Sequence, residues 1–131
     1  MDKTEIRNAV VEYTHLGYQW GDHGVLTYSI GLNYGDSGYQ GFGTHVLDTT
    51  NPARREPGQP PRLPTLFAGG MLWAVDQIFG CDWENLKGKP CRALATFTHI
   101  TALGHYLEDK WMWVDKMGFH VTPLADVPRE S

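Results

Sequence analysis

The sequence has no long apolar run and little positive charge. No segment approaches the roughly 18 apolar residues of a membrane-spanning helix, and the first residues, MDKTEIRN, lack the apolar core of a signal peptide. The 11 lysines and arginines are outnumbered by 15 aspartates and glutamates, which gives a formal net charge of -4. Because nonspecific affinity for nucleic acid polymers and anionic lipid comes mainly from clustered Lys and Arg, we expect a cytoplasmic protein that binds neither of them.

Cysteine is scarce, and familiar catalytic patterns are missing. Cys81 and Cys91 stand in neither a C-x-x-C nor a zinc-type spacing, which favours reduced structural thiols over a disulfide or a metal site. His15, His23 and His45 share no ligand spacing either. No carboxylate pair, serine elbow or Cys-His signature stands out. We therefore expect no cofactor, no metal and no catalytic residue, and a protein that acts by binding.

With 131 residues, the chain has the length of one domain. Residues 25–34 alternate between apolar and polar side chains, which predicts a half-buried strand. Residues 9–18 are β-branched and aromatic, and the turn residues 21–24 join them to that strand as a hairpin. A second turn over residues 35–38 leads into a third predicted strand at 39–47.

The second half of the chain is expected to supply a helix and two more strands. Residues 65–79 have the start and stop signals of a helix, and strands are predicted at 91–97 and 100–107. The predicted fold class is therefore α+β, a mainly antiparallel sheet of about five strands packed with one principal helix. We expect one domain over residues 1–121 and a flexible C-terminal tail over residues 122–131.

A proline-rich loop separates the two halves. Residues 51–64, NPARREPGQPPRLP, hold five prolines, which remove backbone donors and prevent regular structure. The loop also contains three arginines, Arg54, Arg55 and Arg62, the densest positive charge in the sequence. Loops of this length are often functional, so we expect these arginines to meet phosphates, although solvated arginines explain the pattern equally well.

The predicted helix has very little polar surface. On the side opposite its main apolar face lie Leu66, Gly69, Gly70 and Trp73, which are apolar or small. A helix with so little polar surface is buried on more than one side, and a small domain can hardly cover both sides alone. We therefore expect these four residues to contact another copy of the chain in a symmetric homo-oligomer, a dimer or tetramer.

The third predicted strand carries a glycine-rich segment made of Tyr39, Gln40, Gly41, Phe42 and Gly43. It is not a phosphate-binding loop of the usual kind, because a strand and not a helix follows it. Bare amides still allow a ligand to approach the backbone, the aromatic rings can stack on a base, and the glutamine amide can read a base edge. A bulged edge strand is the alternative interpretation.

Two further patterns concern charge and histidine. Lys110 and Trp111 place a cation beside a large ring and can meet a phosphate, or the lysine stem can simply cover a core tryptophan. His99 and His120 each begin a His-x-Thr pattern, which is typical of two-histidine phosphodiesterases. Such a short pattern also recurs by chance, so this enzyme class is kept as an alternative only.

Several segments, taken in order, resemble a widespread family of small phage proteins. They extend over roughly residues 16 to 113 and read Asp22-His23-Gly24, Tyr34-Gly35, Gln40-Gly41-Phe42-Gly43, Leu47-Asp48, Asp82-Trp83-Glu84-Asn85-Leu86-Lys87-Gly88-Lys89, Leu103-Gly104-His105 and Asp109-Lys110-Trp111. The family is similar to anti-defence sponges that sequester the cyclic oligonucleotide signals of bacterial CBASS immunity. The order of the segments is more specific than any one of them.

The resemblance implies a homo-oligomer that binds a cyclic di- or trinucleotide, or a related messenger, without cleaving it, in the cytoplasm of an infected bacterium. The residues expected to contact the ligand are Tyr39, Gln40, Gly41, Phe42, Gly43, Arg54, Arg55, Arg62, Lys110 and Trp111. Two other classes stay open at this point. One is the two-histidine phosphodiesterase, and the other is a phage accessory protein that binds a host protein.

Overall fold

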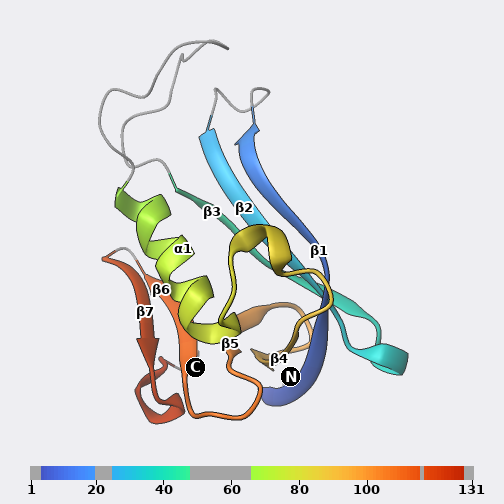
Figure 1. The fold of residues 1–131 in the computed structure, drawn as a ribbon. Coiled ribbons are helices and arrows are strands. Elements are labelled where there is room, and N and C mark those ends of the chain that lie inside the picture. Colours follow the sequence, from blue (N-terminus) through green and yellow to red (C-terminus); the bar gives the residue numbers. More distant parts are fainter. Residues whose placement is uncertain (1–3, 20–24, 48–65, 116, 129–131) are drawn as a thin grey trace.

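The computed structural model of the chain describes residues 4–19, 25–47, 66–115 and 117–128. Within these residues a helix lies against a large sheet, and short 3-10 turns occur along the chain (Figure 1). The elements, in chain order, are β1 (Glu5–Gln19), β2 (Val25–Asn33), η2 (Gly35–Ser37), β3 (Tyr39–Val46), α1 (Leu66–Phe79), η3 (Trp83–Asn85), β4 (Pro90–Ala95), β5 (Ile100–Gly104), β6 (Trp111–Asp115), β7 (Gly118–Thr122) and η4 (Leu124–Asp126).

The strands form one antiparallel sheet in the order β3-β2-β1-β4-β5-β6-β7. The α+β class is confirmed, and the described residues form one principal helix and seven strands, where about five strands were expected. The predicted hairpin at the start of the chain is β1 with β2, and the predicted third strand is β3.

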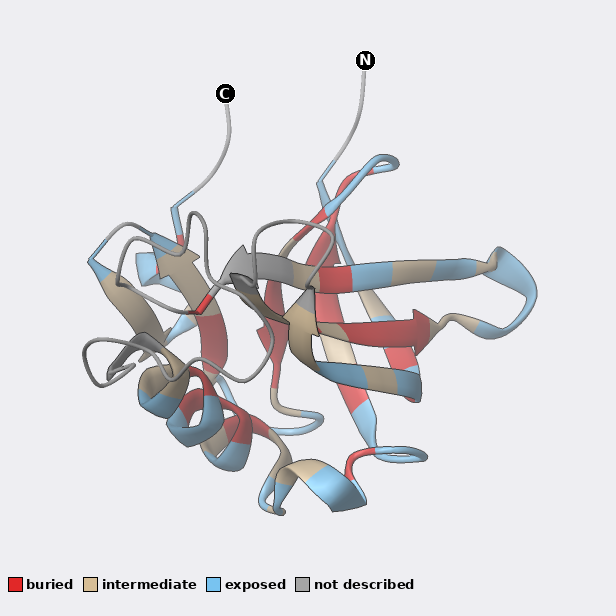
Figure 2. Ribbon diagram, turned by 90° about the horizontal axis from the view of Figure 1, so that it is seen from above, coloured by how far each residue is buried: buried red, intermediate tan, exposed pale blue. Residues whose placement is uncertain are grey.

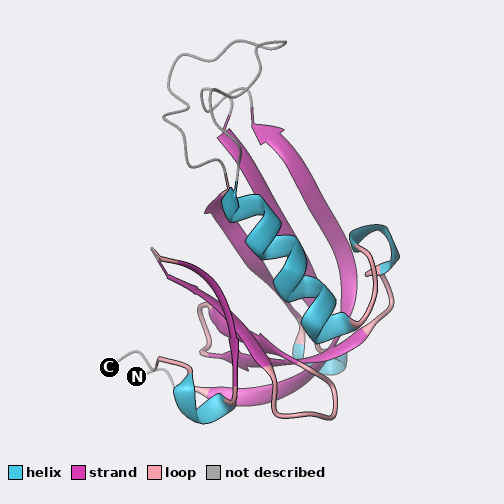
Figure 3. Ribbon diagram, turned by 60° about the vertical axis from the view of Figure 1, so that its left-hand side comes forward, coloured by secondary structure: helices cyan, strands magenta, loops and turns pink. Residues whose placement is uncertain are grey.

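Strand β1 is long enough to serve both halves of the sheet. Its first residues, Glu5 to Val10, pair with β4, whereas the stretch from Val10 to Gln19 pairs with β2. Figure 3 shows the result: the part with β2 and β3 and the part with β4 to β7 diverge from β1, and α1 lies against the sheet between them. The helix packs on β7, β6 and β4.

The core fills the space between the two halves of the sheet and the helix. Tyr28 of β2 lies at its centre, fully buried, with edge-to-face ring contacts to Phe42, Trp83 and Phe119. One side of α1 packs against this cluster through Met71, Ala74, Val75 and Ile78. Burying apolar surface in this way is the main force that holds the two halves together.

The opposite side of α1 is exposed (Figure 2). Gly69, Leu72, Trp73 and Asp76 follow a spacing of three and four residues, so they lie on one stripe of the helix. Leu72 is 42% and Trp73 49% exposed. Within the described residues the chain therefore covers one side of its helix and leaves a partly apolar stripe on the other.

Two features at the C-terminal end differ from expectation. Strands β6 and β7 were not predicted, and they form a hairpin that pairs Trp113 with His120. The tail, expected to be flexible from residue 122, is instead packed as far as Val127, which is 3% exposed in a second small core with Leu94, Ala102 and Trp111. The backbone N–H of Leu124 donates to Asp109 Oδ1 at 2.9 Å and holds this segment down.

No described helix is long and apolar enough to cross a membrane. Both cysteines are free thiols, as expected, and burial raises the pKa of Cys91 to about 12. The predicted loop at residues 51–64, with Arg54, Arg55 and Arg62, lies outside the described residues, as do the side chain of Leu66 and residues 129–131.

Candidate functional site

The glycine-rich segment forms β3, and alternate side chains face opposite sides of the sheet. Phe42 pairs with Ile30 on the inner face and is 3% exposed, in the core. Its ring is therefore not available to stack on a base, contrary to our expectation. Tyr39 lies on the outer face opposite Asn33 and is largely exposed.

Gly31 and Gly43 leave no room for a side chain, whereas Gly41 does. Tyr13 of β1 lies across the neighbouring strand, and a Cβ at Gly31 would sit 2.0 Å from its ring carbon Cε1. Gly41 is opposite Gly31, so the ring rests on bare backbone. Gly43 has a φ of 127°, and a Cβ there would lie 2.6 Å from the backbone oxygen of Tyr28, next to the irregular pairing of β2 and β3.

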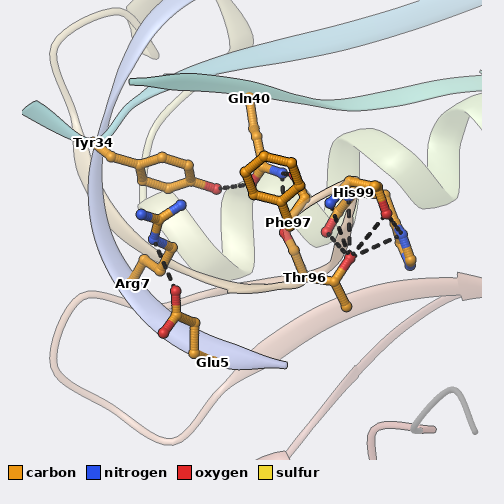
Figure 4. A network of polar contacts seen from close by, with 8 residues as sticks. Glu5, Arg7, Tyr34, Gln40, Thr96, Phe97 and His99 are labelled. Atoms are coloured by element: carbon orange, nitrogen blue, oxygen red, sulfur yellow. Dashed lines mark hydrogen bonds and ion pairs between the residues drawn. The ribbon is translucent and has the colours of Figure 1, made fainter. Parts of the chain in front are cut away.

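Gln40 is partly buried and uses its amide for hydrogen bonds within the chain. Its Oε1 accepts a hydrogen bond from the Tyr34 hydroxyl at 2.6 Å, and its Nε2 donates to the backbone oxygens of Thr96 at 3.1 Å and Phe97 at 3.2 Å (Figure 4). One side chain thus links β3 to the end of β2 and to the turn between β4 and β5. The amide functions as a bridge between the two halves of the sheet.

The turn that Gln40 holds is itself closely hydrogen-bonded. The Thr96 hydroxyl oxygen accepts from the backbone N–H groups of Thr98 at 3.3 Å and His99 at 3.2 Å, and lies 3.1 Å from His99 Nδ1. The backbone N–H of Thr96 donates to the carbonyl of His99 at 2.8 Å. Despite this order, the turn exposes the ring of Phe97, at 86%.

A cation lies next to this bridge, on the inner face of β1. Arg7 pairs with the core residue Ala93, and its guanidinium carbon lies 4.4 Å from the centre of the Tyr34 ring. Its Nε is 3.4 Å from Glu5 Oε1. Burial raises the pKa of Tyr34 to about 12, with the nearby Arg7 charge opposing the rise and Cys91 adding to it, so this phenol stays protonated and continues to donate to Gln40.

Two adjoining hollows open around these residues. The first, of about 360 Å³, is lined by Glu5, Ile6, Arg7, Asn8, Tyr34 and Ser37. The second, of about 290 Å³, is lined by Asn8, Ala9, Val10, Asn33, Tyr34, Gly35, Pro90 and Tyr106. They share Asn8 and Tyr34, so a polar hollow that contains the Arg7–Glu5 ion pair meets a more apolar hollow that contains two amide side chains.

The other residues predicted to bind a ligand lie elsewhere. Trp111 is 1% exposed in the second small core, its Nε1 donates to Asp109 Oδ1 at 3.1 Å, and the Arg92 guanidinium lies 4.9 Å from its ring centre. It is a packing residue and not a stacking surface for a ligand. Lys110 is half-buried and lies 3.9 Å from Glu108 Oε1.

The residues predicted to form the subunit contact lie on two different sides of α1. Gly69 faces open space and Trp73 is exposed on the same stripe, as a contact with a second copy would require. Gly70 lies on the inner side instead, where a Cβ would be 3.8 Å from the Phe119 Cβ. Gly70 thus faces β7 of its own chain, and a Cβ there would make an ordinary contact with it.

The two His-x-Thr segments have separate surroundings. His99 precedes β5 and contacts the threonines of its own turn, whereas His120 on β7 is stacked on Trp113 at 4.2 Å and lies 2.9 Å from Asp115 Oδ1. The hydrogen bond from His120 lowers the pKa of Asp115. Strand β6 lies between β5 and β7. Among the described residues, no group of three or more His, Cys, Asp or Glu side chains could hold a metal ion.

Four residues that line the hollows were not predicted from the sequence: Arg7, Asn8, Asn33 and Tyr106. For Arg7 a signal was present: the alternation that buries Ala9 and Val11 continues backward to Arg7 and Glu5, which puts two charged residues on an inward-facing side of a strand. Tyr106 lies in a loop, and nothing in its local sequence indicates that it reaches β1.

Comparison with protein-family models, with curated proteins and with solved structures finds no match to this chain.

Proposed function

We propose that this protein binds a small nucleotide signal at the two hollows around Asn8 and Tyr34 and sequesters it without cleavage, as a phage protein that counters bacterial immunity would. The observation that carries the proposal is the junction of a hollow that contains the Arg7 guanidinium, paired with Glu5, and a hollow that offers aromatic and amide groups. Such a pair fits the two chemically different ends of a nucleotide, the phosphate and the base.

In the hollow lined by Arg7, a phosphate would replace the largely exposed Glu5 carboxylate as the partner of the guanidinium. Arg7 offers a guanidinium fork, which matches phosphate oxygens better than a single ammonium does. The Tyr34 ring supports that guanidinium from one side, so part of the conformational cost of ordering it is already met before a ligand arrives. The Ser37 hydroxyl on η2 adds a second donor to the same hollow.

The second hollow suits a base. The Tyr106 ring supplies a partly exposed aromatic surface, and the amides of Asn8 and Asn33 supply donors and acceptors. Hollows of roughly 300 Å³ and more are typical of small-molecule sites. A cyclic dinucleotide of roughly 45 non-hydrogen atoms at ~0.3 kcal/mol per atom can reach a dissociation constant near the nanomolar range that a sequestering protein needs.

The proposal includes a homo-oligomer formed through the exposed stripe of α1. Leu72 and Trp73 supply apolar area there, and Gly69 allows another backbone to approach closely. Trp73→Glu puts a charge at the centre of this stripe. We expect this variant to have a lower molar mass in solution than the wild type by light scattering, and an unchanged mass would remove α1 as the contact.

Isothermal titration calorimetry with cyclic di- and trinucleotides tests the binding function. We expect submicromolar binding of one of them to the wild type and roughly 10- to 100-fold weaker binding to Arg7→Ala, because a charged hydrogen bond contributes about 1.5–3 kcal/mol. Lys87→Ala, which removes the same charge from an exposed loop, is the matched control and should bind like the wild type. Equal losses in both variants, or no binding at all, would contradict the proposed site.

A further inference from the structure

Residues Glu5 to Ala9 of β1 have a strand on one side only. They pair with β4, whereas β2 begins to pair at Val10. On the side away from β4, no other strand pairs with this stretch anywhere in the described part of the chain. Unpaired backbone groups on a strand edge are a ready template for a partner that has matching donors and acceptors.

The register tells which backbone groups face the open side. The backbone N–H of Val11 donates to the Lys89 oxygen and the Val11 oxygen accepts from Gly88, so Val11 is hydrogen-bonded toward β4. In an antiparallel pair such residues alternate along the strand. The N–H and C=O of Ile6 and Asn8 therefore point away from β4, toward the hollow that both residues line.

We infer that the open edge of β1 recognises an adenine base, whose Watson–Crick edge pairs with the backbone N–H and C=O of Asn8 while the phosphate meets Arg7. This inference rests on the proposed function and names the ligand class for that same site. Adenine offers one acceptor, N1, beside one donor, the N6 amino group, and so matches one N–H and one C=O. Guanine carries an additional donor at N2 that this pair leaves unmatched.

The surroundings favour a base over an extended peptide at this edge. The open stretch is short, because Asn33 already pairs with Val10, and the Tyr34 ring lines the hollows on both sides of Asn8. A flat base in the plane of the sheet would take the place of a neighbouring strand at this edge, with Tyr34 and Tyr106 beside it. A peptide strand needs a longer open edge to form several pairs of hydrogen bonds.

Ligand analogues test the inference on the unmodified protein. The probes are cyclic di-AMP, its 7-deaza analogue, which keeps N1 and N6, and its 1,N6-etheno analogue, in which both positions are blocked. We expect the 7-deaza analogue to bind within about threefold of the parent and the etheno analogue to bind roughly 100-fold more weakly, as the loss of two hydrogen bonds implies. Equal binding of all three analogues would overturn the inference and leave the proposed function standing, whereas no binding of any cyclic nucleotide would overturn both.

Asn8→Pro supplies an independent test on the protein side. Proline at position 8 removes the N–H that is proposed to contact adenine N1, leaves the N–H of Ile6 on the same edge, and keeps the hydrogen bonds of Arg7 and Ala9 to β4, so an edge position tolerates it. We expect the variant to fold, by circular dichroism, and to bind cyclic di-AMP at least tenfold more weakly. Unchanged affinity in a folded variant would refute the inference. A variant with a lower molar mass than the wild type and unchanged affinity would also refute it. That result would mean that the open edge of β1 pairs with a second copy of the chain in the wild type.

Discussion

Replacing Gln40 by glutamate isolates the bridge between the two halves of the sheet. The two side chains have nearly the same shape, and the carboxylate can still accept the hydrogen bond from Tyr34. It cannot donate to the backbone oxygens of Thr96 and Phe97, and instead places negative charge against two carbonyl dipoles. Gln40→Glu should therefore loosen the turn between β4 and β5.

The expected cost follows from the two lost bonds. A hydrogen bond contributes about 0.5–1.5 kcal/mol net, and a buried acceptor left without a partner costs about 1–3 kcal/mol. Because the site is only partly buried, we expect a loss of about 2 to 4 kcal/mol in the free energy of unfolding at pH 7. This is a large fraction of the stability of a domain of this size.

The assay is urea unfolding followed by tryptophan fluorescence, with Gln77→Glu as control. Gln77 lies on α1 and is half-buried, and its replacement adds the same charge away from the bridge, so its effect should be clearly smaller than that of Gln40→Glu. The oxygens of Thr96 and Phe97 raise the folded-state pKa of a glutamate at position 40 above its unfolded value. Its penalty is therefore full above the folded pKa and disappears as the pH falls below the unfolded pKa.

Two results would refute this reasoning. If Gln40→Glu unfolds at the same urea concentration as the wild type at pH 7, Nε2 does not hold the turn. If the difference between variant and wild type does not shrink on acidification, the cost does not come from the ionised carboxylate. Faster amide hydrogen exchange over residues 96–99 in the variant would locate the loosening at the turn.

Three further predictions follow from the same structure. Gly43→Ala should lower the free energy of unfolding by about 2–4 kcal/mol, because its φ is 127° and its Cβ would meet the backbone oxygen of Tyr28. Gly41→Ala should be tolerated, and urea unfolding of both variants makes the comparison. Cys91 should resist thiol reagents at pH 8 until the protein unfolds, since burial raises its pKa to about 12. Tyr34, with a pKa raised to about 12, should stabilise the fold below the unfolded pKa of about 10 and lose that contribution as pH rises to 12, so Tyr34→Phe should flatten the alkaline side of the stability profile.

The first half of the fold was predictable because its pattern is local. Alternation along residues 25–34 and the flanking turns identified the hairpin and β3 within a few residues. The hairpin of β6 and β7 was missed because Trp111 and Met112 are both buried, on opposite faces, so the segment does not alternate. The packing of the tail could not be predicted from its sequence either, because Val127 is buried in a small core that Leu94 and Trp111 form on the outer face of the sheet.

The site was less predictable than the fold. Aromatic and amide side chains on the glycine-rich strand were expected to face a ligand, but the sheet curves, so Gln40 and Phe42 point into the chain. The hollows arise where β1 leaves β2 to pair with β4, and only the three-dimensional course of β1 brings Asn8 close to Tyr34 and Tyr106. The local sequence around each of these residues does not indicate that they lie close together.

Recovery of an intact ligand distinguishes sequestration from cleavage. The protein is mixed with cyclic di- and trinucleotides, unbound nucleotide is separated and quantified, and the protein fraction is then heated and its released contents chromatographed. We expect that one adenine-containing nucleotide disappears from solution in stoichiometric amount, returns unchanged after heating, and is not taken up by Arg7→Ala. Release of a cleaved product, or uptake that is equally strong in Arg7→Ala, would contradict it.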